Sequence, residues 1–320
     1  TASVPYKSGT DYKERQIFMG NLKRRQYMSW YRLLLIAIIG TLVFNFYPLI
    51  ETFITSLKNM NGSFIGFTNY KILFSSDEFR QSIINTLYMA VLGVGLNVPL
   101  AFIIASVLNS IAHGKGIYRV IFLLPMVMSM ITVVTLFKYM MMPSADGVFN
   151  YILSFFGVAP KLWLNDPKAA RECVVLIAVW KGIGYNIILF FAGLQGISAD
   201  MYEAAEIDGA NAFKRWLYIT IPASKNTFTF VIMTSTIAAL KRFTEIYAVS
   251  RETGNPAGKL ETIMLYIYKN SFSTLNYKDE GLAGAASVIL FIIILAATVL
   301  NNKLTGERKP RRSKRIGGKA

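Results

Sequence analysis

Side chains that usually perform chemistry are few in this 320-residue chain. It holds one histidine, His113, and one cysteine, Cys173, which are too few for the usual structural metal sites or for an internal disulfide. The glycine-containing segment 254–259 has only three residues between its glycines and a leucine after its lysine, so it is not a Walker A loop. We therefore expect a non-catalytic chain that itself binds no metal, nucleotide or other cofactor.

Polar side chains inside apolar runs are the remaining candidates, because charge within a membrane span is costly and is usually functional. Lys181 lies within a long apolar run, and Tyr185 and Asn186 follow it. Lys181 and Tyr185 share a helix face at i, i+4 spacing. Aromatic rings stack on sugar C–H surfaces, and lysine and asparagine donate hydrogen bonds to hydroxyl groups. This face could line a substrate passage. Alternatively, the Lys181 side chain extends to the outer membrane surface.

The elements that would hold these residues are predicted to be membrane helices. Of all residues 53% are hydrophobic and only 16% are charged, an unusual composition for a soluble domain of this size. Uncharged or nearly uncharged runs are long enough to cross the hydrocarbon layer. The sequence thus predicts an all-α polytopic membrane protein with six transmembrane helices, at about residues 33–50, 81–112, 120–137, 173–195, 226–240 and 281–302.

The net charge of +16 is concentrated near the two ends of the chain. Residues 1–32 hold seven Lys and Arg against two acidic residues, and residues 303–320 hold eight against one. Basic residues beside spans favour the cytoplasmic side, so we expect basic cytoplasmic tails at 1–30 and 303–320 around a membrane domain at 31–302. This distribution favours a membrane over a nucleic-acid partner.

Prolines interrupt two of the predicted spans. Pro99, near Gly93 and Gly95, lies in the second run, and Pro125 lies in the third. Each is expected to kink or break its helix.

A charged stretch between the fourth and fifth runs, residues 200–222, is predicted to lie in the cytoplasm. Asp200 and Glu203 have the spacing of a capping box, so a helix should begin near Met201. Gly209 should end that helix in a left-handed conformation. Four residues of a second short helix should then share one face, and Pro222 should begin the next span; these four are Phe213, Trp216, Leu217 and Thr220.

The spacing of this stretch resembles the EAA loop of the membrane subunits of ATP-binding-cassette (ABC) importers. The matching residues are Glu203, Ala204, Ala205, Asp208, Gly209, Ala210, Ile219 and Pro222. The sequence departs from the pattern at Trp216, Ile221 and Asn226, where phenylalanine, leucine and a further proline are usual. The resemblance implies a type I importer permease fold with a cytoplasmic coupling helix. The residues it implies for ATPase coupling are Glu203, Ala204, Ala205, Asp208, Gly209, Ala210, Phe213 and Trp216.

Weaker motifs resemble the carbohydrate-uptake branch of these permeases, the relatives of maltose and glycerol-phosphate permeases. They include segments 67–74, 123–125, 147–150, 163–167, 192–195, 266–268 and 285–288. In that family the region of Phe243, Glu245 and Tyr247 is near the outer end of the pathway. Lys241 and Glu245 could also simply neutralise each other at i, i+4 spacing, so a gate, a binding-protein contact and an ordinary interface all remain open.

The resemblance also implies the partners and location of the chain. It would be half of a pathway in a bacterial plasma membrane, paired with a second homologous permease. Two ATPase subunits, carrying ATP and Mg²⁺, would dock on the cytoplasmic side, and an extracytoplasmic solute-binding protein would deliver a saccharide. An amino-acid or phosphate-ester cargo is the alternative within the class. An ion-driven secondary carrier is a further alternative, although inverted repeats typical of carriers are not seen.

Overall fold

The computed structural model describes residues 30–31, 34–111, 115–273 and 278–305. Regular structure in these residues is helical, apart from one isolated antiparallel bridge between Lys58 and Phe64. The all-α prediction is therefore confirmed for the described part of the chain. Both basic tails lie almost wholly outside the described residues, as does His113. The chain divides into two compact units, and the boundary lies between residues 55 and 56.

The first unit carries an apolar helix that runs over Leu34–Ser56. It contains a π-helical turn, η1 (Leu42–Phe46), and continues as α2 (Tyr47–Ser56). Its 23 residues suffice to cross a bilayer. Within it, the Thr41 and Thr52 hydroxyls donate to backbone carbonyls four residues earlier, at 2.9 and 2.8 Å. These bonds satisfy polar groups that lipid cannot satisfy.

The second unit contains three further helices of spanning length: α4 (Asp77–Ser110), α8 (Ala170–Gln195) and α15 (Glu280–Thr305). A bent pair, α5 (Lys115–Val127) and α6 (Met130–Met140), could form one more span. Helix α12 (Lys225–Leu240) has 16 residues, fewer than a usual span. The described residues thus supply four helices that are long and apolar enough to cross a membrane, or five if the bent pair counts as one span, and the prediction of six remains a prediction.

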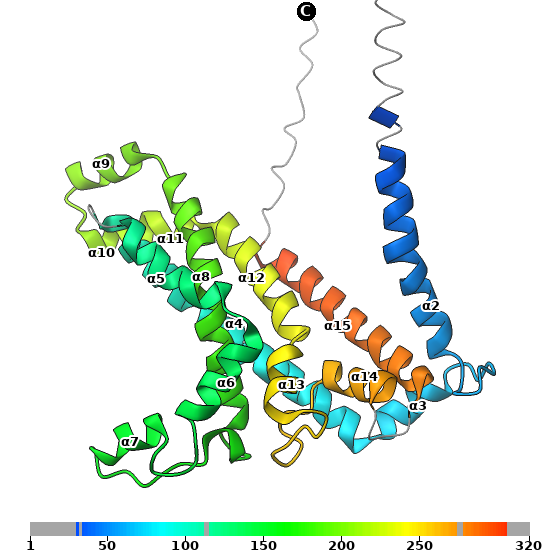
Figure 1. Ribbon diagram of the computed structural model, residues 1–320. Coiled ribbons are helices and arrows are strands. Elements are labelled where there is room, and N and C mark those ends of the chain that lie inside the picture. Colours follow the sequence, from blue (N-terminus) through cyan, green and yellow to red (C-terminus); the bar gives the residue numbers. More distant parts are fainter. Residues whose placement is uncertain (1–29, 32–33, 112–114, 274–277, 306–320) are drawn as a thin grey trace, which may run out of the picture. The chain divides into compact units, whose positions relative to one another are not determined.

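Helix α8 packs against α4, α5 and α12, and α15 packs against α12 and α14 (Ile263–Phe272) (Figure 1). One core lies where α4, α8 and α12 meet. There the Phe102 ring is 5.2 Å from Phe190 and 4.5 Å from Phe228, measured between centroids. A second core joins α3 (Thr68–Ser75), α4, α14 and α15 through Leu73, Phe79, Ile263 and Ala286. Aromatic and aliphatic packing of this kind fixes how the helices are arranged.

The two proline predictions have different outcomes. Helix α4 continues through Pro99, so the prediction that the helix could break there is wrong. The third run is broken, as predicted, with a 95° bend between α5 and α6. The break lies at Ser129, whose ψ of 138° is extended, and not at Pro125, which is inside α5.

Buried asparagines hold the connecting segments to the helices. The Asn85 amide donates to the carbonyls of Gly258 and Glu261, each at 2.8 Å. Asn150, in α7 (Val148–Ser154), accepts from the Trp163 indole of η2 (Trp163–Asn165) at 2.8 Å and donates to the Met142 carbonyl at 3.0 Å. A carboxamide both donates and accepts, so it can satisfy loop backbone groups that are removed from water.

A buried carboxyl group lies in the loop between α13 (Thr244–Ser250) and α14. Glu261 is 3% exposed, and its Oε2 lies 3.2 Å from the Lys269 ammonium, while Oε1 has no hydrogen-bond partner. Burial raises the pKa of Glu261 to about 7, against the opposing effect of Lys269. Between pH 4.5 and about 7 the folded protein therefore retains a proton on Glu261 that the unfolded chain has lost.

This raised pKa predicts a loss of stability as pH rises from about 4.5, the ordinary pKa of glutamate, to about 7. Below that range both states are protonated, and above it both are ionised and the full cost of burying the carboxylate applies. Glu261→Gln should flatten this part of the curve of melting temperature against pH, whereas Glu280→Gln, at an exposed position, should leave it unchanged. Parallel curves for wild type and Glu261→Gln would contradict the prediction.

Candidate functional site

The first helix of the predicted EAA loop is α9 (Ala199–Ile207). Its N-cap is Ser198, whose hydroxyl accepts from the Asp200 amide at 3.3 Å. The predicted capping box is therefore wrong: Asp200 lies inside the first turn, and the helix begins two residues before Met201. Both serine and aspartate are good caps, and the sequence offers them two residues apart. Asp200 can still favour the positive helix start electrostatically.

The turn after α9 confirms the prediction for Gly209, whose φ is +75°. The Gly209 amide donates to the Glu206 carbonyl at 3.0 Å, and the Ala210 amide donates to the Ala205 carbonyl at 2.9 Å. These two bonds define a Schellman motif. Glycine adopts the left-handed conformation without the steric cost of a Cβ atom, so this residue fixes where α9 ends and the chain turns.

The second part of the loop is one interrupted helix. It consists of α10 (Ala212–Arg215), the π-helical turn η3 (Trp216–Thr220) and α11 (Ile221–Ala223), which leads into α12. Asn211 caps its start by accepting from the Lys214 amide at 2.9 Å. Pro222 is the second residue of α11, which directly follows the π turn.

The predicted four-residue face is confirmed only in part: the Phe213 and Trp216 rings stack with their centroids 6.1 Å apart, but the π turn changes which of the later side chains share that face. Trp216 packs inward with its ring 5.9 Å from that of Phe102. Thr220 is also buried, and its hydroxyl is 3.0 Å from that of Tyr202. Phe213 is 66% exposed and Leu217 39% exposed. An i→i+5 turn holds one more residue than an α turn, which rotates the residues after it.

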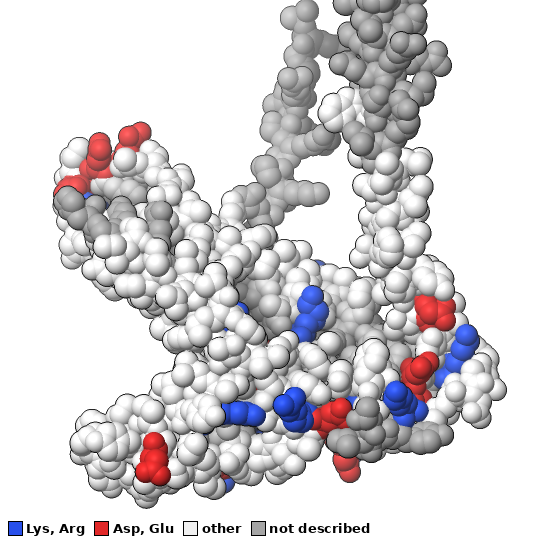
Figure 2. Space-filling model, in the orientation of Figure 1, with Lys and Arg blue, Asp and Glu red and all other residues white. Residues whose placement is uncertain are grey.

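The loop presents an exposed surface at one end of α8, whereas α7 lies near the other end of that helix (Figure 1). Acidic side chains gather over α9 (Figure 2). The exposed residues among those predicted to couple are Glu203, Ala204, Asp208, Gly209 and Phe213, and the half-buried ones are Ala205, Ala210 and Trp216. Ile207 is 87% exposed. A protruding helix pair with small and apolar exposed residues has the form of a docking surface.

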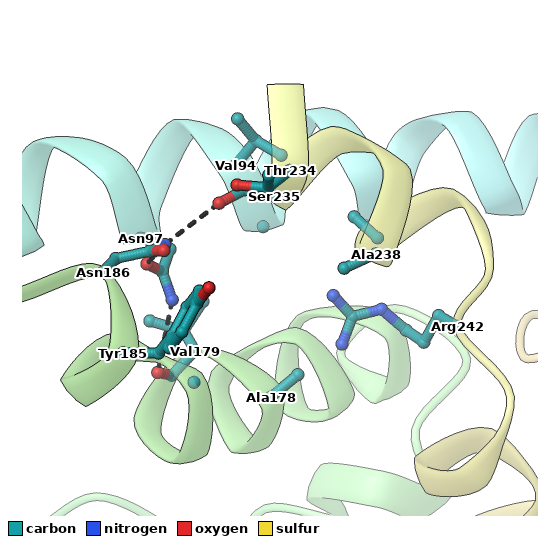
Figure 3. Close-up of a pocket in the computed structure, with 13 residues that line it drawn as sticks. Val94, Asn97, Ala178, Val179, Tyr185, Asn186, Thr234, Ser235, Ala238 and Arg242 are labelled. Atoms are coloured by element: carbon teal, nitrogen blue, oxygen red, sulfur yellow. Dashed lines mark hydrogen bonds between the residues drawn. The ribbon is translucent and has the colours of Figure 1, made fainter. Parts of the chain in front are cut away.

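A cavity of about 250 Å³ lies between α4, α8 and α12 (Figure 3). Tyr185 and Asn186, both predicted pathway residues, line it together with Asn97 and Ser235. The Asn186 amide donates to Asn97 Oδ1 at 2.6 Å and to the Ser235 hydroxyl at 3.0 Å. Amide, hydroxyl and phenol groups can exchange hydrogen bonds with a polyhydroxylated ligand.

Arg242 also lines this cavity. It pairs with Glu245, so the predicted pair between Lys241 and Glu245 is wrong. Its Nη1 atom lies 2.8 Å from Glu245 Oε1, with both side chains about nine-tenths buried. Lys241 is exposed instead. A Cβ atom at Gly93 would lie 3.2 Å from Arg242 Nη2, so glycine leaves room for the guanidinium group. The helix α12 ends near Lys241, and an i, i+4 rule for continuous helices does not extend across that end.

The other predicted pathway residues lie elsewhere. Phe243 and Tyr247 form an aromatic cluster with Tyr268, whose ring centroid is 5.0 Å from each of them. The Lys181 ammonium donates to the Met126 carbonyl at 3.2 Å, and Lys181 does not line the cavity. The sequence analysis did not single out Asn97 or Ser235 and did not pair Arg242 with Glu245, although a polar residue within an apolar run was the signal that identified Asn186.

Comparison with protein families and solved structures gives consistent matches. Residues 80–304 match the model of the family described as binding-protein-dependent transport system inner membrane component. The lactose transport system permease protein LacF of Rhizobium radiobacter is 34% identical over 265 residues, covering 81% of this chain and 87% of LacF. The trehalose/maltose transport system permease protein MalF of Thermococcus litoralis is 34% identical over 288 residues, covering 88% and 95%.

A third relative is the sn-glycerol-3-phosphate transport system permease protein UgpA of Agrobacterium fabrum, 32% identical over 286 residues, covering 87% of this chain and 94% of UgpA. Among solved structures, a chain of a bacterial ABC transporter that imports the acidic polysaccharide alginate superposes with a TM-score of 0.78 at 25% identity, covering 92% of this chain and 99% of that one.

The helical fold, the exposed turn at Gly209 and these matches agree with the resemblance stated from the sequence. The chain belongs to the family of binding-protein-dependent transport system inner membrane components.

Proposed function

We propose that this chain is the permease subunit of an ABC importer and forms half of the pathway for a saccharide delivered by an extracytoplasmic binding protein. Relatives named for lactose and for trehalose and maltose support a sugar cargo. A solved alginate transporter was crystallised with its alginate-bound periplasmic protein, which supports a receptor partner. The chain performs no catalysis, and ATP is hydrolysed on separate ATPase subunits.

The observation that carries this proposal is the exposed two-helix loop at 199–223 in a chain of this family. The small residues Ala204 and Ala205 permit close approach of another backbone. Each of two permeases, this chain and a homologous second one, engages one ATPase through such a loop. ATP binding then shifts the transporter between two conformations because the ATPases contact the loops differently in each.

The membrane topology in this proposal has six spans. Helix α12 crosses with help from residues at its ends, and the bent pair α5 and α6 forms the third span. Both basic tails and the loop at 199–223 lie in the cytoplasm, as the positive-inside rule favours. The chain resides in a bacterial plasma membrane.

The cavity between α4, α8 and α12 serves as part of the sugar pathway. Its volume of about 250 Å³ is below that of the usual pocket for a drug-sized ligand, so it accommodates a small part of an oligosaccharide at one time. Its paired amides and hydroxyl groups suit the hydroxyl groups of a sugar. Asn186 lies at the centre of this network.

Co-purification of the tagged chain from its native membrane tests the proposed function. The expected companions are an ATPase, a second permease of this family and a soluble receptor that carries a saccharide. A receptor that carries an amino acid or a phosphate ester would contradict the cargo. Recovery of the chain with no ATPase would contradict the function itself.

Gly209→Val should uncouple transport from ATP hydrolysis while the transporter still assembles. Nothing lies within 4 Å of a Cβ atom at this position, so the cost is the left-handed backbone conformation, about 1–2 kcal/mol. The change should alter the turn and displace α10. Transport per ATP hydrolysed, measured in proteoliposomes, should fall for Gly209→Val and remain near wild type for Gly209→Asn, since asparagine tolerates this conformation. A wild-type ratio for Gly209→Val would argue against the coupling role.

Asn186→Leu should lower sugar uptake several-fold without lowering receptor-independent ATP hydrolysis. The substitution leaves Asn97 and Ser235 without their amide partner and makes the cavity wall apolar. Ile188→Leu, on the exposed side of the same helix, is the matched control. Uptake that is equal for the two variants would remove Asn186 from the pathway.

A further inference from the structure

The break in the third span leaves the last backbone carbonyls of α5 without amide partners in their own helix. Helix α5 ends at Val127, α6 begins at Met130, and their axes differ in direction by 95°. The last four carbonyl groups of any α-helix have no amide partner within that helix. At membrane depth water does not supply one, so another part of the protein must.

Helix α8 supplies a donor at this end. Lys181, near the middle of α8, directs its ammonium at the Met126 carbonyl, with an Nζ to oxygen distance of 3.2 Å. One turn further along α8, a Cβ atom at Gly184 would lie 2.1 Å from the Phe122 carbonyl oxygen. The backbone of α5 therefore rests directly on α8 at Gly184, and Lys181 reaches its final turn.

The pairing is electrostatically favourable for both groups. The C-terminal end of a helix carries partial negative charge, which a cation stabilises. A lysine in the middle of a span is costly unless it finds such a partner. The chain uses the same chemistry again: the Lys138 ammonium donates at 2.7 Å to the carbonyl of Ala248, in the last turn of α13.

We propose that Lys181 is a positioning residue that holds the third span in its bent form by capping the end of α5. This role is independent of the cargo and of the ATPase, and it differs from both alternatives that the sequence raised, a substrate contact and extension to the outer membrane surface. Gly182 and Tyr185, its neighbours on α8, line the cavity. Fixing α5 on α8 thus steadies the helix that carries these residues.

Spin labels at two exposed positions, Ile117 on α5 and Tyr139 on α6, measure the bend directly. Two arms of about 15 Å each at nearly a right angle place these residues about 20 Å apart, against about 33 Å for one straight helix at 1.5 Å per residue. Pulsed electron paramagnetic resonance on the full transporter in nanodiscs, with the buried Cys173 replaced by alanine, should give a single peak near the shorter distance.

Lys181→Met should broaden this distance distribution and shift it toward the longer value. Lys181→Arg keeps a cationic donor and should retain the short peak, as should Lys241→Met, which removes an exposed lysine of α12. A short peak for Lys181→Met would overturn the proposal, and so would equal broadening for Lys181→Met and Lys181→Arg.

Gly184→Ala tests the same contact if Lys181→Met does not accumulate. The added methyl group must push the Phe122 carbonyl away, and the cap should open with the same lengthening. Gly95→Ala, where nothing lies within 4 Å of the new Cβ atom, is the matched control and should retain the short peak. An unchanged peak for Gly184→Ala would count against the proposal in the same way, as would a dominant long distance in the unsubstituted protein.

Discussion

A membrane offers no hydrogen bonds to a backbone, and this constraint governs the irregular parts of the chain. Where a helix stops or a loop turns inward, a side chain from elsewhere supplies the missing donor. Lys181 and Lys138 donate to carbonyls near the ends of α5 and α13. Asn85 and Asn150 do the same for loops outside the predicted spans, where burial in protein removes backbone groups from water. Lys181 thus shows how a polar residue inside an apolar run can help a broken helix to be tolerated.

The two candidate functional surfaces differ in whether their polar groups already have partners within the protein. Polar groups that line the cavity between α4, α8 and α12 are already bonded to one another, through Asn97, Asn186 and Ser235. A ligand with hydroxyl groups can exchange with such a network at small cost, because each bond that it breaks is replaced. The loop at 199–223 is different: its second helix is anchored by Trp216 and Thr220, while α9 exposes small and acidic residues. A partner protein can cover that surface.

Local sequence rules predicted the features that depend on a few neighbouring residues. The turn at Gly209 could be predicted because glycine favours a positive φ, and the long apolar helices could be predicted from their composition. The predictions that were wrong depended either on tertiary structure or on a choice between two suitable residues. Ser198 and Asp200 compete as caps, and the end of α12 decides that Arg242, not Lys241, pairs with Glu245. The break at Ser129 has no glycine or proline of its own to mark it in the sequence. The motif at 203–222 identified the family because it is a local pattern.

In the proposed transporter, the loop at 199–223 transmits motion from a separate ATPase. A photo-crosslinking residue placed at the exposed Ala204 of the full transporter tests it most directly, with the exposed Tyr151 of α7 as the reference position. Ala204 should capture the ATPase subunit, with a yield that changes when ATP binds, and Tyr151 should not. Capture of no ATPase from Ala204, in a transporter that hydrolyses ATP and imports its cargo, would contradict it.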